Sequence, residues 1–112
     1  MCRGRELIRT VHADRPGLLI GILGVLPRAP GPFASGLTEA ELMLRVDTLN
    51  QGMQSLVASM PGVVYASCWH ELCDSSRKGF MNKQFFADYV HLNNRGYAVL
   101  TAAIFRLIQR LQ

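Results

Sequence analysis

The sequence predicts an α/β fold with helices on both faces of a parallel sheet, and three observations support this. The run LLIGILGVL, residues 18–26, carries no polar side chain, which is typical of a strand buried on both faces. Apolar residues then recur at spacings of three and four, as on the buried face of an amphipathic helix, at Leu42, Val46, Leu49, Met53, Leu56 and Met60. The segment VVYASCW, residues 63–69, is rich in β-branched and aromatic residues and predicts a second strand. Strand, helix and strand in this order form a βαβ unit.

The N-terminal half also carries clear helix and loop signals. Residues 4–13 predict a helix with Leu7, Ile8 and Val11 on one face, ended by DRPG at 14–17. Residues 27–36 predict a loop, because three prolines and two glycines fall within ten positions. Thr38 and Glu41 match a capping box, which predicts that a helix begins there and ends at the Pro-Gly pair 61–62.

The C-terminal part predicts an irregular stretch over 70–87 and then a final amphipathic helix. Each apolar side chain that this helix buries contributes about 1.5–3 kcal/mol to stability. The predicted buried face consists of Tyr97, Leu100, Ile104, Leu107 and Leu111.

Composition narrows the class of protein. The 112 residues suit one domain, and 49% hydrophobic with 18% charged residues is ordinary globular composition. The longest apolar run is far shorter than the roughly 20 residues of a membrane span, and no secretory signal is recognisable. Three irregularly spaced cysteines predict a reducing, cytoplasmic location. The net charge of +4 is spread along the chain, so no nucleic-acid partner is expected. No cofactor is expected either.

Two strands are too few for the predicted sheet. A strand as apolar as 18–26 expects a neighbour on each edge, and open edges invite association. We therefore expect residues 1–112 to be part of a larger α/β domain or to self-associate through unpaired sheet edges.

Four segments resemble the SGNH, or GDSL-like, serine esterases. They are GVLPR at 24–28, VDTLNQGM at 46–53, GVVYASCW at 62–69 and FFADYVHLNNRGY at 85–97. The nearest branch looks like the catalytic subunits of platelet-activating-factor acetylhydrolase. The resemblance implies a three-layer α/β/α sandwich, flavodoxin-like, of which this chain holds the C-terminal portion. Its most specific element is the pattern D-x-x-H-L-N-x-x-G-Y, running from Asp88 to Tyr97.

In that family the histidine of this pattern is the general base for a nucleophilic serine, and the aspartate orients its imidazole. The resemblance therefore implies that His91 and Asp88 are catalytic residues acting on a small-molecule ester. The alternative is that Asp88 is a loop carboxylate and His91 a helix-flanking residue satisfied by backbone.

The sequence departs from the family at the nucleophile. The family places its serine in a Gly-Asp-Ser turn, and this chain has no Gly-Asp dipeptide. Ser67 falls within a predicted strand, and the others fall on a helix or in loops: Ser35, Ser55, Ser59, Ser75 and Ser76. We therefore expect the chain alone to be inactive as an esterase, whether it is a truncated gene product, a fragment of a longer protein or a degenerate relative retained for binding.

Two further groups of residues have alternative interpretations. A metal ion could be held by Cys68, His70 and Cys73, with Asp74 adjacent and His91 as a further ligand. A simpler interpretation is that Cys68 is a small core residue and His70 a loop residue. Arg28, in the Leu-Pro-Arg turn, could bind an anionic substrate group or pair with a structural acid. A non-catalytic interaction module and a small metal-binding protein remain alternatives to the esterase reading.

Overall fold

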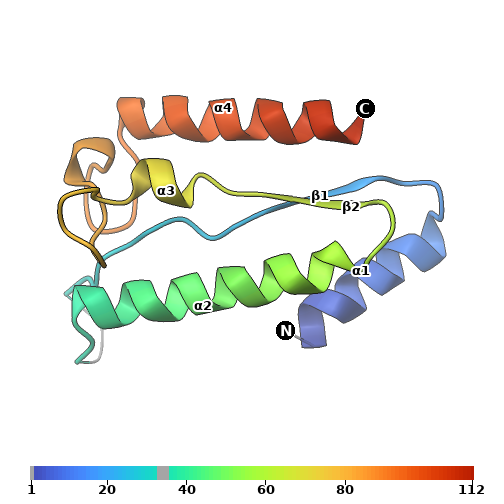
Figure 1. The fold of residues 1–112 in the computed structure, drawn as a ribbon, viewed down its shortest axis with the longest axis horizontal. Helices are drawn as coiled ribbons and strands as arrows, with labels where there is room; N and C mark the ends of the chain where they lie inside the picture. The colour runs from blue at the N-terminus through green and yellow to red at the C-terminus, as the bar shows by residue number, and fades with distance from the viewer. Residues whose placement is uncertain (1, 33–35) are drawn as a thin grey trace.

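The structure, a computed structural model, describes residues 2–32 and 36–112. Figure 1 shows the path of the chain. None of the helices in these two ranges combines the length and apolar character needed to cross a membrane. The elements are α1 (Cys2–Asp14), β1 (Ile20–Leu23), α2 (Glu39–Ala58), β2 (Val63–Ala66), α3 (Trp69–Leu72), the 3-10 helix η1 (Lys83–Phe85) and α4 (Asn94–Leu111).

The two strands form a parallel sheet, so the predicted βαβ unit and the mixed α/β class are confirmed. Ile20 lies opposite Val63, and the register continues to Leu23 opposite Ala66. Strand β1 is shorter than the strand predicted over residues 18–26. Beyond its C-terminal end, the Asn50 side chain accepts a hydrogen bond from the Val25 N–H and donates one to the Val25 carbonyl, each at 2.8 Å, which replaces strand pairing at that residue.

Helices cover the two faces of the sheet, and Figure 1 shows the strands between α4 and α2. On one face the strand side chains pack against Ile8 of α1 and Val57 of α2. On the other face α4 crosses β1 so closely that a Cβ added at Gly21 would lie 3.0 Å from a methyl carbon of Leu107. The strand residues on the α1 and α2 face are Ile20, Ile22, Val63 and Tyr65.

A second core lies at the carboxyl ends of the strands. It is centred on Leu72, which is fully buried, and it joins α2, α3, α4 and the loops between α3 and α4. This core positions the segment that precedes α4. Its buried members are Ala29, Met43, Cys68, Leu72, Met81, Phe86, Leu92 and Ala103.

The capping box that predicts the start of α2 is present. The Glu41 N–H donates to the Thr38 hydroxyl at 3.1 Å, and the Thr38 N–H donates to the Glu41 carboxylate at 3.2 Å. The buried face of α2 is rotated from the predicted one, since Leu49 is exposed and Asn50 is buried. Asn50 is buried because it binds the backbone of Val25.

The predicted buried face of α4 is only partly correct. Leu107 is buried, but Tyr97 is 53% and Ile104 is 39% exposed. The reason is that the sheet has two strands in the described residues, so the apolar face of α4 is wider than the sheet beneath it.

The segment after β2 also differs from the prediction. The strand ends at Ala66, so Ser67 does not lie in a strand, and Trp69 begins the short helix α3. The stretch predicted as irregular holds most of α3 and all of η1. Short helices of this kind have too few residues to show a periodic pattern.

Candidate functional site

Asp88 and His91 form a tight turn immediately before α4. The Asp88 Oδ1 atom accepts hydrogen bonds from the backbone N–H groups of Val90, at 2.8 Å, and His91, at 2.7 Å. The Asp88 Oδ2 atom lies 2.8 Å from Nδ1 of the His91 ring. The Ala87 N–H donates to the His91 carbonyl at 2.8 Å and closes the turn. One carboxylate therefore holds both the backbone and the imidazole of the histidine.

The hydrogen bonds of the turn favour the ionised form of the Asp88 carboxyl. The backbone N–H groups of His91 and Val90, followed by the His91 side chain, lower the pKa of Asp88 to about 2. An ionised carboxylate can only accept hydrogen bonds, so Nδ1 of His91 carries the proton in this contact. The His91 side chain is 71% exposed, and the Asp88 side chain is 44% exposed.

The residues after His91 position this turn on the helix. Leu92 is buried in the core, and the Asn93 side chain caps α4 by accepting from the Gly96 N–H at 3.0 Å. Asn93 Nδ2 also donates to the Gln84 carbonyl at 2.8 Å. Gly96 has no room for a side chain, because a Cβ there would collide with the Phe85 carbonyl oxygen. The described geometry thus explains the Leu, Asn and Gly of the sequence pattern, whereas Tyr97 is exposed.

The turn lies against the loop that follows β1. The Ala29 N–H donates to the Tyr89 carbonyl at 2.8 Å, so the residue that follows the Leu-Pro-Arg segment is hydrogen-bonded to the Asp88–His91 turn. Figure 1 shows these loops at the end of the molecule where the strands lead into α3 and where α4 begins. Ligands of open α/β sheets bind at this carboxyl end of the strands. A cavity of about 350 Å³ lies beside the turn, lined among others by Ala29, Glu39, Met81, Lys83, Phe86 and Asp88.

Arg28 does not join the pair. Its residue is exposed, and the ion pairs found among the described residues, His91–Asp88 and Arg106–Glu71, do not include it. The acidic partner predicted as one alternative for Arg28 is therefore not among these ion pairs.

No described serine is hydrogen-bonded to the His91 ring. The Ser67 hydroxyl accepts from the Trp69 N–H at 3.0 Å, and the Ser59 hydroxyl donates to the Leu56 carbonyl at 3.0 Å. The Ser76 hydroxyl donates to Asp74 at 2.7 Å. Ser35 lies outside the described residues.

The alternative metal site is not formed. Across residues 2–32 and 36–112, no group of three or more His, Cys, Asp or Glu side chains is arranged to hold a metal ion. Cys68 is buried in the core, as the simpler interpretation predicts. Burial raises the pKa of Cys68, and burial followed by the charge of Asp47 raises the pKa of Cys73 to about 11. Both thiols therefore disfavour the thiolate form that binds metals.

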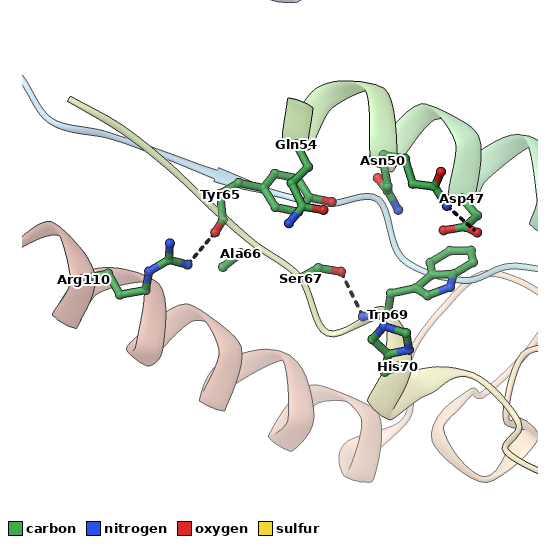
Figure 2. Close-up of a pocket in the computed structure, with 10 residues that line it drawn as sticks. Asp47, Asn50, Gln54, Tyr65, Ala66, Ser67, Trp69, His70 and Arg110 are labelled. Atoms are coloured by element: carbon green, nitrogen blue, oxygen red, sulfur yellow. Dashed lines mark hydrogen bonds between the residues drawn. The ribbon is translucent and has the colours of Figure 1, made fainter. Parts of the chain in front are cut away.

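A separate polar hollow of about 510 Å³ lies along the outer side of β2. Figure 2 shows Arg110 of α4 reaching the backbone carbonyl of Tyr65, a hydrogen bond of 2.6 Å. Burial raises the pKa of the Tyr65 phenol, and the charge of Asp47 adds to this effect. His70 also lines the hollow, but no hydrogen bond joins it to Ser67 or Asp47 in the described part of the chain. The Arg110 side chain therefore occupies one outward-facing carbonyl of β2, that of Tyr65.

Sequence reasoning missed the structural roles of Asn50 and Arg110. For Asn50 the sequence did hold a signal, a polar residue on the apolar side of a helix, because a buried amide needs hydrogen-bond partners. Arg110 carried no local signal, because its partner, Tyr65, lies 45 residues away in sequence.

The sequence matches no protein-family model, and no curated protein matches it.

Proposed function

We propose that Asp88 and His91 are the Asp–His part of an SGNH-type serine esterase site. The observation that carries this proposal is the 2.8 Å contact between Asp88 Oδ2 and His91 Nδ1, made by a carboxylate that the backbone holds in place. The resemblance of residues 85–97 to the family pattern supports it. In this proposal the two-stranded sheet belongs to a larger three-layer α/β/α sandwich.

The chemistry assigned to the pair is general base and general acid catalysis of acyl transfer. His91 Nε2 takes the proton of a serine hydroxyl as that oxygen attacks the ester carbonyl, and later returns a proton to the leaving group. Asp88 keeps the proton on Nδ1 and stabilises the imidazolium that forms. No cofactor is required, and a small-molecule ester is the substrate class.

The described residues offer His91 no serine, so the proposal needs a nucleophile and an oxyanion hole from elsewhere. Arg28, next to the Ala29 residue that is hydrogen-bonded to the turn, is the proposed contact for an anionic substrate group. A cytoplasmic location remains part of the proposal.

The experiment adds the missing half in trans. The chain by itself should hydrolyse p-nitrophenyl acetate no faster than its Asp88→Ala, His91→Ala double variant. Mixing it with the N-terminal half of an SGNH esterase, which carries the Gly-Asp-Ser block, should give hydrolysis that His91→Ala abolishes and Ser76→Ala leaves unchanged.

Two outcomes would contradict this proposal. Saturable hydrolysis by the chain alone, abolished by His91→Ala and by one serine substitution, would show that the nucleophile lies within the chain. If the two halves bind one another but the complex shows no His91-dependent hydrolysis, the catalytic assignment is wrong.

An interaction module is the second candidate, and the exposed apolar surface around β1 favours it. Leu18, Leu19 and Val25, which flank β1, are 44%, 54% and 44% exposed, and Ile104, Phe105 and Ile108 of α4 are exposed as well. Large exposed apolar patches mark interaction sites in soluble proteins.

A further inference from the structure

Two cavities adjoin where α2 lies beside β2 and α3. The polar hollow along β2 shares the lining residues Asp47, Trp69 and His70 with a second cavity of about 610 Å³. This second cavity, the α2–α3 cavity, is bounded by α2, α3 and the loop 73–79. Its volume falls within the range of about 300–1,000 Å³ that is typical of small-molecule sites.

Asp47 brings a negative charge to the boundary between the two cavities. It lies half-buried in the middle of α2, and its Oδ2 atom accepts a hydrogen bond from Gln51 Nε2 at 3.2 Å. No ion pair of Asp47 is found in the part of the chain that the structure describes. Because burial removes part of the hydration of a carboxylate, a cation that enters the cavity would stabilise this charge.

Trp69 gives the same boundary an aromatic wall. Its side chain packs only partly against the core, and it lines both cavities. Figure 2 shows the indole extending from the start of α3 toward α2, in the direction of Asp47. An organic ammonium group is attracted both by the face of an aromatic ring and by a carboxylate.

The charges that line the α2–α3 cavity are opposite in sign to the net charge of the chain. Asp47 and Asp74 line it together with one lysine, Lys78, whereas the chain as a whole carries +4. Hydrogen bonds from Ser76 lower the pKa of Asp74, so this carboxyl is ionised at neutral pH. Among the described residues, no group of three or more His, Cys, Asp or Glu side chains is arranged to hold a metal ion. The lining therefore favours an organic cation over a metal ion.

We propose that the α2–α3 cavity binds a small amphipathic organic cation. The ammonium group contacts the Asp47 carboxylate and the Trp69 ring. The apolar part of the ligand lies over Met43, Leu44 and Cys73, which line the same cavity. Leu44 is 67% exposed, so covering it removes apolar surface from water.

This binding site goes beyond the proposed esterase function and does not depend on it. The lining residues come from α2, α3 and the loop 73–79, so strands added beside β1 in the proposed larger sandwich leave the cavity in place. Asp88→Ala with His91→Ala should leave binding of the cation unchanged, so failure of the esterase proposal and failure of this site are distinguishable.

The first test titrates the full chain with n-hexyltrimethylammonium and follows the fluorescence of Trp69, the single tryptophan. The emission should change saturably at millimolar ligand. Tetramethylammonium, which lacks the hexyl tail, should bind at least about tenfold more weakly, because it covers less apolar surface. Hexyl sulfate, an anion with the same tail, should not bind. No saturable change with the cation, or equal binding of hexyl sulfate, would overturn the proposal.

The second test changes single charges. Asp47→Asn keeps an oxygen that can accept from Gln51 and removes the charge, so it should weaken binding of n-hexyltrimethylammonium at least about fivefold. Asp14→Asn, at an exposed position at the end of α1, is the matched control and should bind as the wild type does. Lys78→Met removes a like charge and should strengthen binding about twofold. Circular dichroism checks that each variant keeps its helices.

Two outcomes of the second test would overturn the proposal. One is an Asp47→Asn variant that binds the cation as tightly as the Asp14→Asn control. The other is a Lys78→Met variant that binds it no more tightly than the wild type, and this comparison holds even if Asp47→Asn does not fold.

Discussion

Gly96→Ala tests the packing that holds the Asp88–His91 turn on α4. The added methyl would collide with the Phe85 carbonyl oxygen and would lie 2.7 Å from Leu92 Cδ2. Overpacking of this kind costs about 1–3 kcal/mol, and loss of the 3.0 Å bond from the Asn93 N–H to the Phe85 carbonyl costs about 0.5–1.5 kcal/mol. Replacing a helical glycine by alanine returns about 1 kcal/mol. The net expectation is a loss of about 0.5–3.5 kcal/mol in the free energy of unfolding.

The assay is urea unfolding at one fixed protein concentration, followed by the fluorescence of Trp69, the single tryptophan. Trp69 packs against the core that contains Leu92, so its emission reports on this region. A loss of about 2 kcal/mol lowers the urea midpoint by about 1 M for a typical small protein. Gly17→Ala is the control, because a Cβ at Gly17 meets no atom within 4 Å. If Gly96→Ala is as stable as the wild type, or if Gly17→Ala loses as much, the close approach at Gly96 is not the reason for this glycine.

Three other predictions follow from the structure. The Asp88 carboxyl should titrate with a midpoint near pH 2 by carbon NMR, and a midpoint near 4 would contradict the observed hydrogen bonds. Because this pKa lies below its ordinary value of 3.8, the ionised carboxylate stabilises the turn above about pH 4 and loses that effect as the pH falls toward 2. Asn50→Ala should lower the free energy of unfolding by about 1–3 kcal/mol, since the Val25 N–H and carbonyl lose their hydrogen-bond partner. Gln51→Ala, at an exposed position, should change it little, and equal effects of the two substitutions would contradict the role assigned to Asn50. Cys73 should react slowly with a disulfide reagent at neutral pH until the chain unfolds, since the pKa of its thiol is about 11, and rapid reaction of the folded chain would contradict this. EDTA should leave the unfolding curve unchanged, and unfolding on chelation would contradict the absence of a bound structural metal at these thiols.

The candidate pair was visible in the sequence because its contacts are local. Asp88 and His91 are three residues apart, and a short turn brings the carboxylate to the ring without help from distant elements. The capping signal at Thr38 and Glu41 is local in the same way and correctly marked the start of α2. Arg28 could not be placed, because the direction of an exposed side chain in a loop depends on neighbours that the sequence does not identify.

The sequence by itself determined the order of helices and strands, the parallel sheet and the turn at Asp88 and His91, because periodicity, capping and short-range hydrogen bonding act between residues close in the chain. The tertiary structure decided which half of the apolar face of α4 is buried, since that depends on how many strands lie beneath the helix. It also decided the role of Arg110, whose contact with Tyr65 exists only when α4 packs beside β2. Gly96 belongs to both levels: the sequence pattern singled it out, and only the packing of α4 against Phe85 shows why a side chain does not fit there.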